Sequence, residues 1–108
     1  MAKILIAEDD ETVRSLVVRA LGEDGHDLTV TGDGAAALDA LDRHNGDFDL
    51  LLTDVKMPAM DGIALALATG SGHPEVAIML MTGYADQRER AHGLDALVHD
   101  VIAKPFSV

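Results

Sequence analysis

The chain has 108 residues, which suffices for one domain, and 48% of them are hydrophobic, enough to form a core. It has no cysteine, which excludes disulfides, thiolate metal sites and a cysteine nucleophile, and its net charge of −11 disfavours binding to nucleic acid or to anionic membranes. No apolar run approaches the roughly 20 residues that cross a bilayer, and no secretory signal is recognisable, so we expect a cytoplasmic protein.

Strands and helices are predicted to alternate along the chain. Continuous apolar runs predict buried strands at residues 4–7, 28–31, 48–53, 76–81 and 101–103. Apolar residues at helical spacing predict helices at residues 11–22, 35–41 and 63–68, and the polar segment 86–97 is also predicted to be helical. Residues 69–74 are rich in glycine and are expected to form a loose connection. The alternation predicts a single α/β domain with one doubly wound parallel sheet.

Acidic, hydroxyl and basic residues stand directly after four of the predicted strands. They are Glu8, Asp9, Asp10, Asp54, Thr82 and Lys104. Right-handed crossovers place the carboxyl ends of parallel strands at one edge of the sheet, where ligands of such sheets bind. We therefore expect these residues to converge, although the first and the last are far apart in the sequence.

The converging carboxylates predict a metal site. Carboxylates in a small cleft stay ionised together when a cation lies among them, and Mg²⁺ accepts one or two carboxylates together with waters and phosphate oxygens. Glu8 and Asp9 on one strand and Asp54 on another supply such ligands. Two structural alternatives stand beside this interpretation: Asp10 fits a cap for the following helix, and Asp54 taken alone fits a turn residue after a strand.

Residues 51–62, Leu-Leu-Thr-Asp-Val-Lys-Met-Pro-Ala-Met-Asp-Gly, resemble the phosphoacceptor segment of two-component response-regulator receiver domains. The resemblance runs from residue 3 to residue 106, with its parts in the order and spacing of the family. It implies one receiver domain over residues 1–108 and a flavodoxin-like (CheY-like) five-stranded parallel sheet with strand order 2-1-3-4-5. Stand-alone receivers, including the CpdR type, are the most similar in organisation, and a receiver excised from a hybrid kinase fits almost as well.

The resemblance also implies a role for each site residue. Asp54 would accept a phosphoryl group from a histidine kinase or a phosphotransfer protein. Glu8, Asp9 and Asp54, with the backbone carbonyl of Lys56, would bind Mg²⁺. Thr82 would hydrogen-bond the phosphoryl group and Lys104 would pair with it. The output would pass to another protein, and the chain would be a phosphoryl acceptor rather than an enzyme.

Three positions depart from the usual receiver pattern. Val101 stands where many receivers carry a switch Tyr or Phe, so a rotating aromatic cannot report phosphorylation from there. Lys56 lies two residues after Asp54, and we expect Lys56→Asn to change the lifetime of the phosphoryl group. The sequence ends at Val108, so the usual last helix is expected to be missing or truncated.

Two other functions are compatible with parts of this pattern. One is a receiver-like interaction module that is never phosphorylated. The other is an aspartate-nucleophile phosphatase of the haloacid dehalogenase type, which places a second Asp two residues after the nucleophile, where this chain has Lys56. The sequence does not identify the cognate kinase, the output partner or the oligomeric state.

Overall fold

The computed structural model of the chain describes residues 2–55, 57, 60–82 and 100–103, with the backbone alone for residue 82 and residues 100–103. Strands and helices alternate in the described part. They are β1 (Lys3–Ala7), α1 (Glu11–Glu23), β2 (Asp27–Thr31), α2 (Gly34–Arg43), β3 (Leu50–Asp54), α3 (Gly62–Gly72), β4 (Ala77–Thr82) and β5 (Asp100–Ala103). None of the described helices is long and apolar enough to span a membrane.

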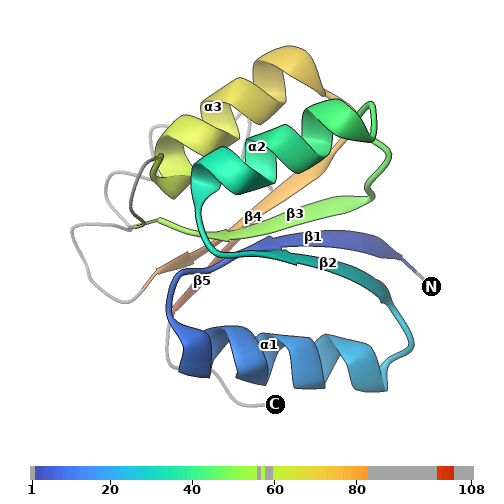
Figure 1. Cartoon of the computed structure of the whole chain (residues 1–108), viewed down its shortest axis with the longest axis vertical. Helices are drawn as coiled ribbons and strands as arrows, with labels where there is room; N and C mark the ends of the chain where they lie inside the picture. The colour runs from blue at the N-terminus through green and yellow to red at the C-terminus, as the bar shows by residue number, and fades with distance from the viewer. Residues whose placement is uncertain (1, 56, 58–59, 83–99, 104–108) are drawn as a thin grey trace.

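The strands form one parallel sheet in the order β2-β1-β3-β4-β5 (Figure 1). This confirms the predicted α/β class and the strand order 2-1-3-4-5. The register aligns Ala7 of β1 with Thr53 of β3, and Asp54 with Met81 of β4. The ends of β1 and β3 therefore lie at the same level, side by side in the middle of the sheet. The predicted helix at residues 86–97 and the segment after residue 103 lie outside the described residues.

Helices cover both faces of the sheet, with α1 on one face and α2 and α3 on the other (Figure 1). Leu5 and Ala7 of β1 belong to the core cluster on the α2 and α3 face, whereas Ile4 and Ile6 pack with Val17 of α1. Alternate residues of a strand point to opposite faces, so a strand covered on both sides must be apolar throughout. This explains the continuous apolar run of β1 and gives its carboxyl end a rigid support.

Each described helix begins at an aspartate that caps it. The side chain of Asp10 accepts hydrogen bonds from the backbone N–H groups of Thr12 and Val13 at the start of α1. Asp33 and Asp61 accept from the backbone N–H group three residues later at the starts of α2 and α3. Such caps satisfy N–H groups that have no partner inside the helix. The capping role expected for Asp10 is confirmed.

The third helix is longer than the sequence pattern predicts. The structure continues α3 to Gly72, so the prediction of a loose connection over residues 69–74 is wrong for most of that segment. Thr69 is buried and its hydroxyl donates a 2.8 Å hydrogen bond to the carbonyl oxygen of Leu65, one turn earlier. Packing of this face of the helix outweighs the low helix propensity of Gly70 and Gly72. Strand boundaries also differ by one or two residues from the predicted ones. At the site edge, β3 ends at Asp54 and β4 at Thr82, each one residue later than predicted.

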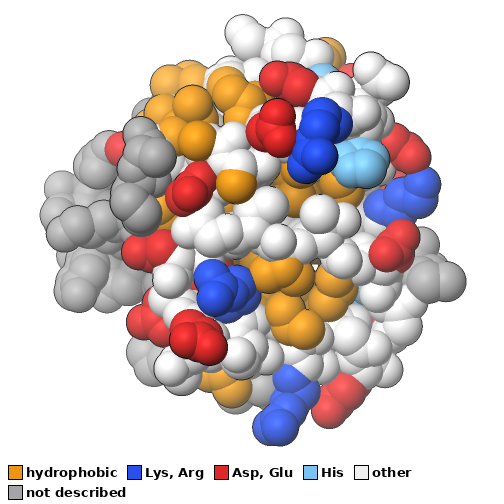
Figure 2. Space-filling model, in the orientation of Figure 1, with side chains coloured by type: hydrophobic (Ala, Val, Ile, Leu, Met, Phe, Trp, Pro, Cys, Tyr) orange, Lys and Arg blue, Asp and Glu red, His pale blue; other side chains and the backbone are white. Residues whose placement is uncertain are grey.

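Charge is unevenly spread over the surface. Acidic side chains occur at many points of the face in Figure 2, and an apolar patch lies over α3 at its upper left. The α3 sequence contains no charged residue, and Leu67 on its outer side is 48% exposed. The net negative charge is therefore carried by the other elements and by the loops.

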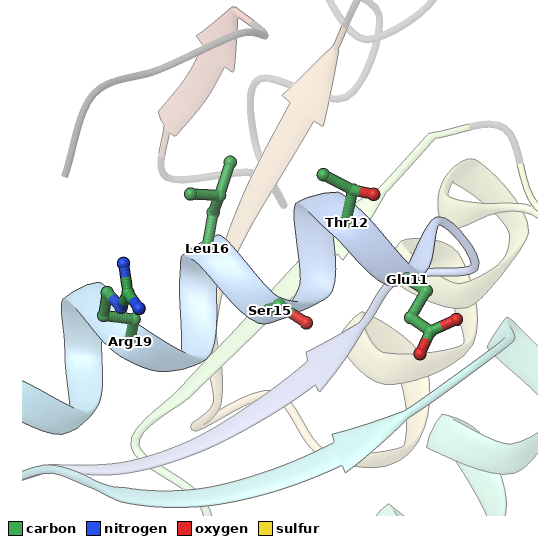
Figure 3. Close-up of a pocket in the computed structure, with 5 residues that line it drawn as sticks. All are labelled: Glu11, Thr12, Ser15, Leu16 and Arg19. Atoms are coloured by element: carbon green, nitrogen blue, oxygen red, sulfur yellow. The ribbon is translucent and has the colours of Figure 1, made fainter.

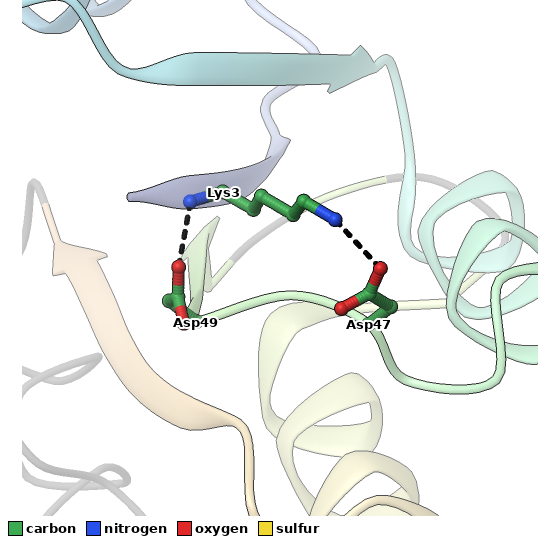
Figure 4. Close-up of polar contacts among 3 residues, drawn as sticks. All are labelled: Lys3, Asp47 and Asp49. Atoms are coloured by element: carbon green, nitrogen blue, oxygen red, sulfur yellow. Dashed lines mark hydrogen bonds and ion pairs between the residues drawn. The ribbon is translucent and has the colours of Figure 1, made fainter. Parts of the chain in front are cut away.

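Two aspartates hold Lys3 at the amino edge of the sheet, opposite to the strand ends discussed below (Figure 4). The Nζ of Lys3 lies 2.7 Å from an Asp47 carboxylate oxygen, and the backbone N–H of Lys3 donates to Asp49 at 2.8 Å. The Lys3 ammonium lowers the pKa of Asp47, and the same contact raises the pKa of Lys3. Both side chains are exposed, so salt screens their attraction and we expect a small contribution to stability.

Candidate functional site

Three carboxylates meet at the carboxyl edge of the sheet. One ligand oxygen from each of Glu8, Asp9 and Asp54 lies within 4.8 Å of the other two. Glu8 is fully buried and Asp54 is 5% exposed, whereas Asp9 is exposed to solvent. The cluster therefore combines two buried carboxylates with an exposed one. It brings together the three acidic side chains that the sequence assigned to a metal.

The backbone at Glu8 is held from two neighbouring elements. Its N–H donates to the carbonyl oxygen of Thr31 at 3.1 Å, which extends the pairing of β1 with β2 by one residue. Its carbonyl oxygen accepts a 3.0 Å hydrogen bond from Nη1 of Arg14, which reaches back from α1. These two bonds fix the end of β1 from which the first acidic side chains project.

The backbone around Asp54 is held in a similar way. Asp54 Oδ1 accepts a 2.8 Å hydrogen bond from the backbone N–H of Val55, and the Thr53 hydroxyl donates to the Asp54 carbonyl at 2.9 Å. Gly62 donates its N–H to the carbonyl of Val55 at 2.7 Å. A Cβ at position 62 would overlap the carbonyl oxygen of Asp54, so only glycine fits there without displacing that backbone. Met57, which the sequence placed in the loop beside Asp54, is buried in the core and anchors that loop.

The donor set fits a hard divalent cation. All three groups offer carboxylate oxygens, and Mg²⁺ binds such oxygens at about 2.0–2.1 Å while keeping several waters. Like charges this close repel each other in a partly buried cleft, and a cation among them removes that repulsion. Asp9 is exposed, so a cation bound there can be reached by solvent. The site therefore fits Mg²⁺, in agreement with the prediction from the sequence.

The other predicted site residues are placed only in part. Thr82 is the last residue of β4 and pairs with Ala103 of β5, one residue beyond the pairing of Asp54 with Met81. Its backbone is thus at the same edge as the acidic cluster. The side chain of Thr82 and the whole of Lys56 and Lys104 lie outside the described residues, as does the side chain of Val101.

A separate hollow of about 420 Å³ runs along α1, and Figure 3 shows the side chains that line it. They are Glu11, Thr12, Ser15, Leu16 and Arg19. None of the three clustered carboxylates lines this hollow, so it is distinct from the acidic cluster.

The sequence pattern did not predict two residues that support the cluster. Thr31 and Arg14 hold the peptide groups of Glu8. Arg14 could have been suspected, because a cation in the first turns of a helix opposes the helix dipole and needs another partner. The contact of Thr31 depends on tertiary packing, so no local sequence pattern indicates it.

Comparison with known proteins identifies a family for this fold and site. The family model of the response regulator receiver domain matches residues 4–108. The response regulator receiver protein CpdR of Brucella abortus is 44% identical over 106 residues, which cover 98% of this chain and 87% of that protein. The transcriptional regulatory protein TcrA of Mycobacterium tuberculosis is 31% identical over 98% of this chain, which spans only 41% of that longer protein.

Solved structures with the same fold agree with this assignment. The response regulator protein TrrA from Thermotoga maritima, solved in complex with Mg²⁺-BeF, superposes with a TM-score of 0.85 at 25% identity, over 98% of this chain and 89% of that one. The chemotaxis response regulator CheY4 of Vibrio cholerae gives a TM-score of 0.84 at 27% identity, over 99% of this chain and 89% of that one. The sheet order, the acidic cluster and these matches together show that the chain belongs to the response-regulator receiver domain family of two-component signalling.

Proposed function

We propose that this receiver is a phosphorylation-dependent signalling switch in which Asp54 accepts a phosphoryl group from a histidine kinase or a phosphotransfer protein. The observation that carries the proposal is the meeting of Glu8, Asp9 and Asp54 at one strand edge, within 4.8 Å of each other. The similar protein TrrA was solved in complex with Mg²⁺-BeF, which supports the part of the proposal that concerns Mg²⁺. The proposed location is cytoplasmic, with a protein as the downstream partner.

Asp54 has the properties of the nucleophile in this scheme. A carboxylate is ionised at neutral pH and needs no general base before it attacks. Its Oδ1 is held by the Val55 N–H, which restrains rotation of the carboxylate. The O–P bond from the Asp54 carboxylate forms as the P–N bond of the donor phosphohistidine breaks, and the electron pair of that bond returns to the imidazole of the donor.

The surrounding groups stabilise charge on the transferring phosphoryl group. The transition state spreads negative charge over three oxygens, so catalysis depends mainly on cations and donors placed around it. Mg²⁺ held by Glu8, Asp9, Asp54 and the Lys56 carbonyl would neutralise part of that charge. In the proposal, the Thr82 hydroxyl donates a hydrogen bond to one phosphoryl oxygen and the Lys104 ammonium pairs with another.

The direct test is incubation with acetyl phosphate and Mg²⁺, followed by intact mass measurement. The proposal expects a gain of one phosphoryl group per chain. No gain under conditions where Mg²⁺ binds would favour a receiver-like module that acts without phosphorylation. Continuous hydrolysis of generic phosphate esters at enzyme-like rates would instead favour the phosphatase alternative.

Substitutions at neighbouring positions 9 and 10 should separate metal binding from helix capping. Saturating Mg²⁺ is expected to raise the melting temperature of the wild type, since Mg²⁺ at ten times its Kd adds about 1.4 kcal/mol. Asp9→Ala should lose most of this Mg²⁺-induced rise in melting temperature, because it removes a metal ligand. Asp10→Ala should keep the increment and lower stability by about 1 kcal/mol with or without Mg²⁺, because it removes the α1 cap. Thermal melts with Mg²⁺ and with EDTA measure both effects, and an Asp9→Ala protein that keeps the full increment would contradict the metal assignment.

Lys56→Asn is expected to shorten the lifetime of the phosphorylated protein. Two residues after the acceptor, the lysine ammonium can stabilise the negative charge of the phosphoryl group and obstruct an attacking water. Asparagine is neutral and shorter, so it should do both less well. Decay of the phosphorylated form, followed by intact mass, gives the lifetime. Lys3→Asn is the matched control, because it makes the same substitution at the opposite edge of the sheet. Equal decay of all three proteins would remove this role for Lys56.

A further inference from the structure

Arg14 occupies an unusual place for a cation. It lies early in α1, four residues after the Asp10 cap, where the partial positive charge of the helix amino terminus disfavours a basic side chain. The Arg14 side chain is half-buried and its Nη1 donates to the carbonyl oxygen of Glu8, six residues earlier. The guanidinium also lies beside the loop after β2, since a Cβ at Gly32 would be 3.5 Å from Nη1. Arg14 therefore joins α1, the end of β1 and the loop after β2.

The peptide groups on both sides of Glu8 are restrained. The N–H of Glu8 is bonded to Thr31 at 3.1 Å and its carbonyl to Arg14 at 3.0 Å. The second of these groups is the peptide that leads directly to Asp9. Its orientation sets the direction of the Asp9 carboxylate relative to that of Glu8.

We propose that Arg14 is a positioning residue for the metal site, which holds the Glu8–Asp9 peptide so that both carboxylates face one cation. This inference rests on the proposed Mg²⁺ site and extends it to a residue that does not touch the metal. Hydrogen-bond partners of metal ligands commonly change metal affinity about 10- to 100-fold when removed. Loss of the Arg14 bond should therefore weaken Mg²⁺ binding.

A simple charge effect predicts the opposite sign. Arg14 is positive, so its removal would reduce repulsion of Mg²⁺ and tighten binding if charge alone mattered. The direction of the change in Kd consequently decides between positioning and electrostatics. A role in folding alone would lower the melting temperature without changing the Kd of the folded protein.

The experiment measures the Kd of Mg²⁺ by calorimetric titration of the full chain and of three variants. Arg14→Met keeps the apolar stem and removes the donor and the charge, and we expect its Kd to rise about tenfold. Arg14→Lys keeps a donor and the charge, and its Kd should stay within about threefold of the wild type. Arg19→Met loses the same charge from an exposed position on the same helix, and its Kd should not rise.

Each outcome has a definite meaning. A Kd for Arg14→Met that is unchanged or lower would overturn the positioning role. If Arg14→Met does not fold, Arg14→Ala replaces it, since it also removes the donor and the charge and has the highest helix propensity, and a Kd unchanged or below that of the wild type would again overturn the role. Failure of the wild type to bind Mg²⁺ would overturn the metal site itself. Normal Mg²⁺ binding without phosphorylation by acetyl phosphate would overturn the proposed function and leave the role of Arg14 intact.

Discussion

Asp54→Asn is expected to abolish phosphorylation by acetyl phosphate in the presence of Mg²⁺. The amide oxygen can still accept the hydrogen bond from Val55, so the local backbone keeps its support. The neutral amide is a poor nucleophile and cannot form the aspartyl phosphate. Intact mass should show the added phosphoryl group in the wild type and none in the variant.

Stability and a matched substitution make this result interpretable. Asp54→Asn removes one of three mutually repelling carboxylates, so in EDTA the variant should be at least as stable as the wild type. Asp49→Asn is the control, because Asp49 directly precedes β3 and Asp54 ends it. The control should be phosphorylated normally. Phosphorylation of Asp54→Asn to the wild-type level would show that another residue is the acceptor.

Gly62→Ala is expected to be the most destabilising small substitution at this edge. The added Cβ would overlap the carbonyl of Asp54, which belongs to backbone and cannot move aside as a flexible side chain does. Overpacking of this kind costs about 3 kcal/mol, which corresponds to a fall in melting temperature of roughly 10 °C or more. Because the displaced carbonyl belongs to the backbone of Asp54, the acceptor carboxylate should shift with it, and the folded protein should also be phosphorylated more slowly.

Gly22→Ala is the control for Gly62→Ala, because the same substitution is expected to stabilise the protein at position 22. Gly22 lies near the end of α1 with nothing within 4 Å of the position of its Cβ. Alanine at such a helical position stabilises by about 0.5–1 kcal/mol, because it restricts the unfolded chain. Chemical denaturation of both variants measures the two effects. Equal stability of Gly62→Ala and the wild type would mean that the close approach at Asp54 does not constrain the protein.

The elements that the sequence predicts well are those whose packing is visible in the local pattern. β1 is buried on both faces, so its apolar run alone identifies it, and the acidic residues that follow mark where it ends. α3 was predicted too short because its second half depends on burial of Thr69, which outweighs the local effect of glycine. Residues adjacent in the sequence do not show whether a side chain such as that of Thr69 will be buried against a distant element.

The same distinction holds for the site. Topology alone brings Glu8, Asp9 and Asp54 together, because parallel strands share an edge, and the structure agrees. The contacts that orient them come from Thr31 and Arg14, whose side chain or backbone reaches the site through tertiary contact. The sequence pattern thus predicts which groups carry the chemistry, whereas their support depends on side-chain and backbone geometry.

The aspartate caps of the three described helices have a further consequence for an anionic ligand. Each of the three helices is the next element after a strand of the parallel sheet, so their amino termini lie toward the edge that holds the acidic cluster. The carboxylates of Asp10, Asp33 and Asp61 are bound to backbone N–H groups, and each faces the partial positive charge of its own helix. These three carboxylates are thereby partly offset where they stand. In the proposed function, the cluster around Asp54 would then attract a cation to one point of a protein of net charge −11 and present that cation to an incoming anion.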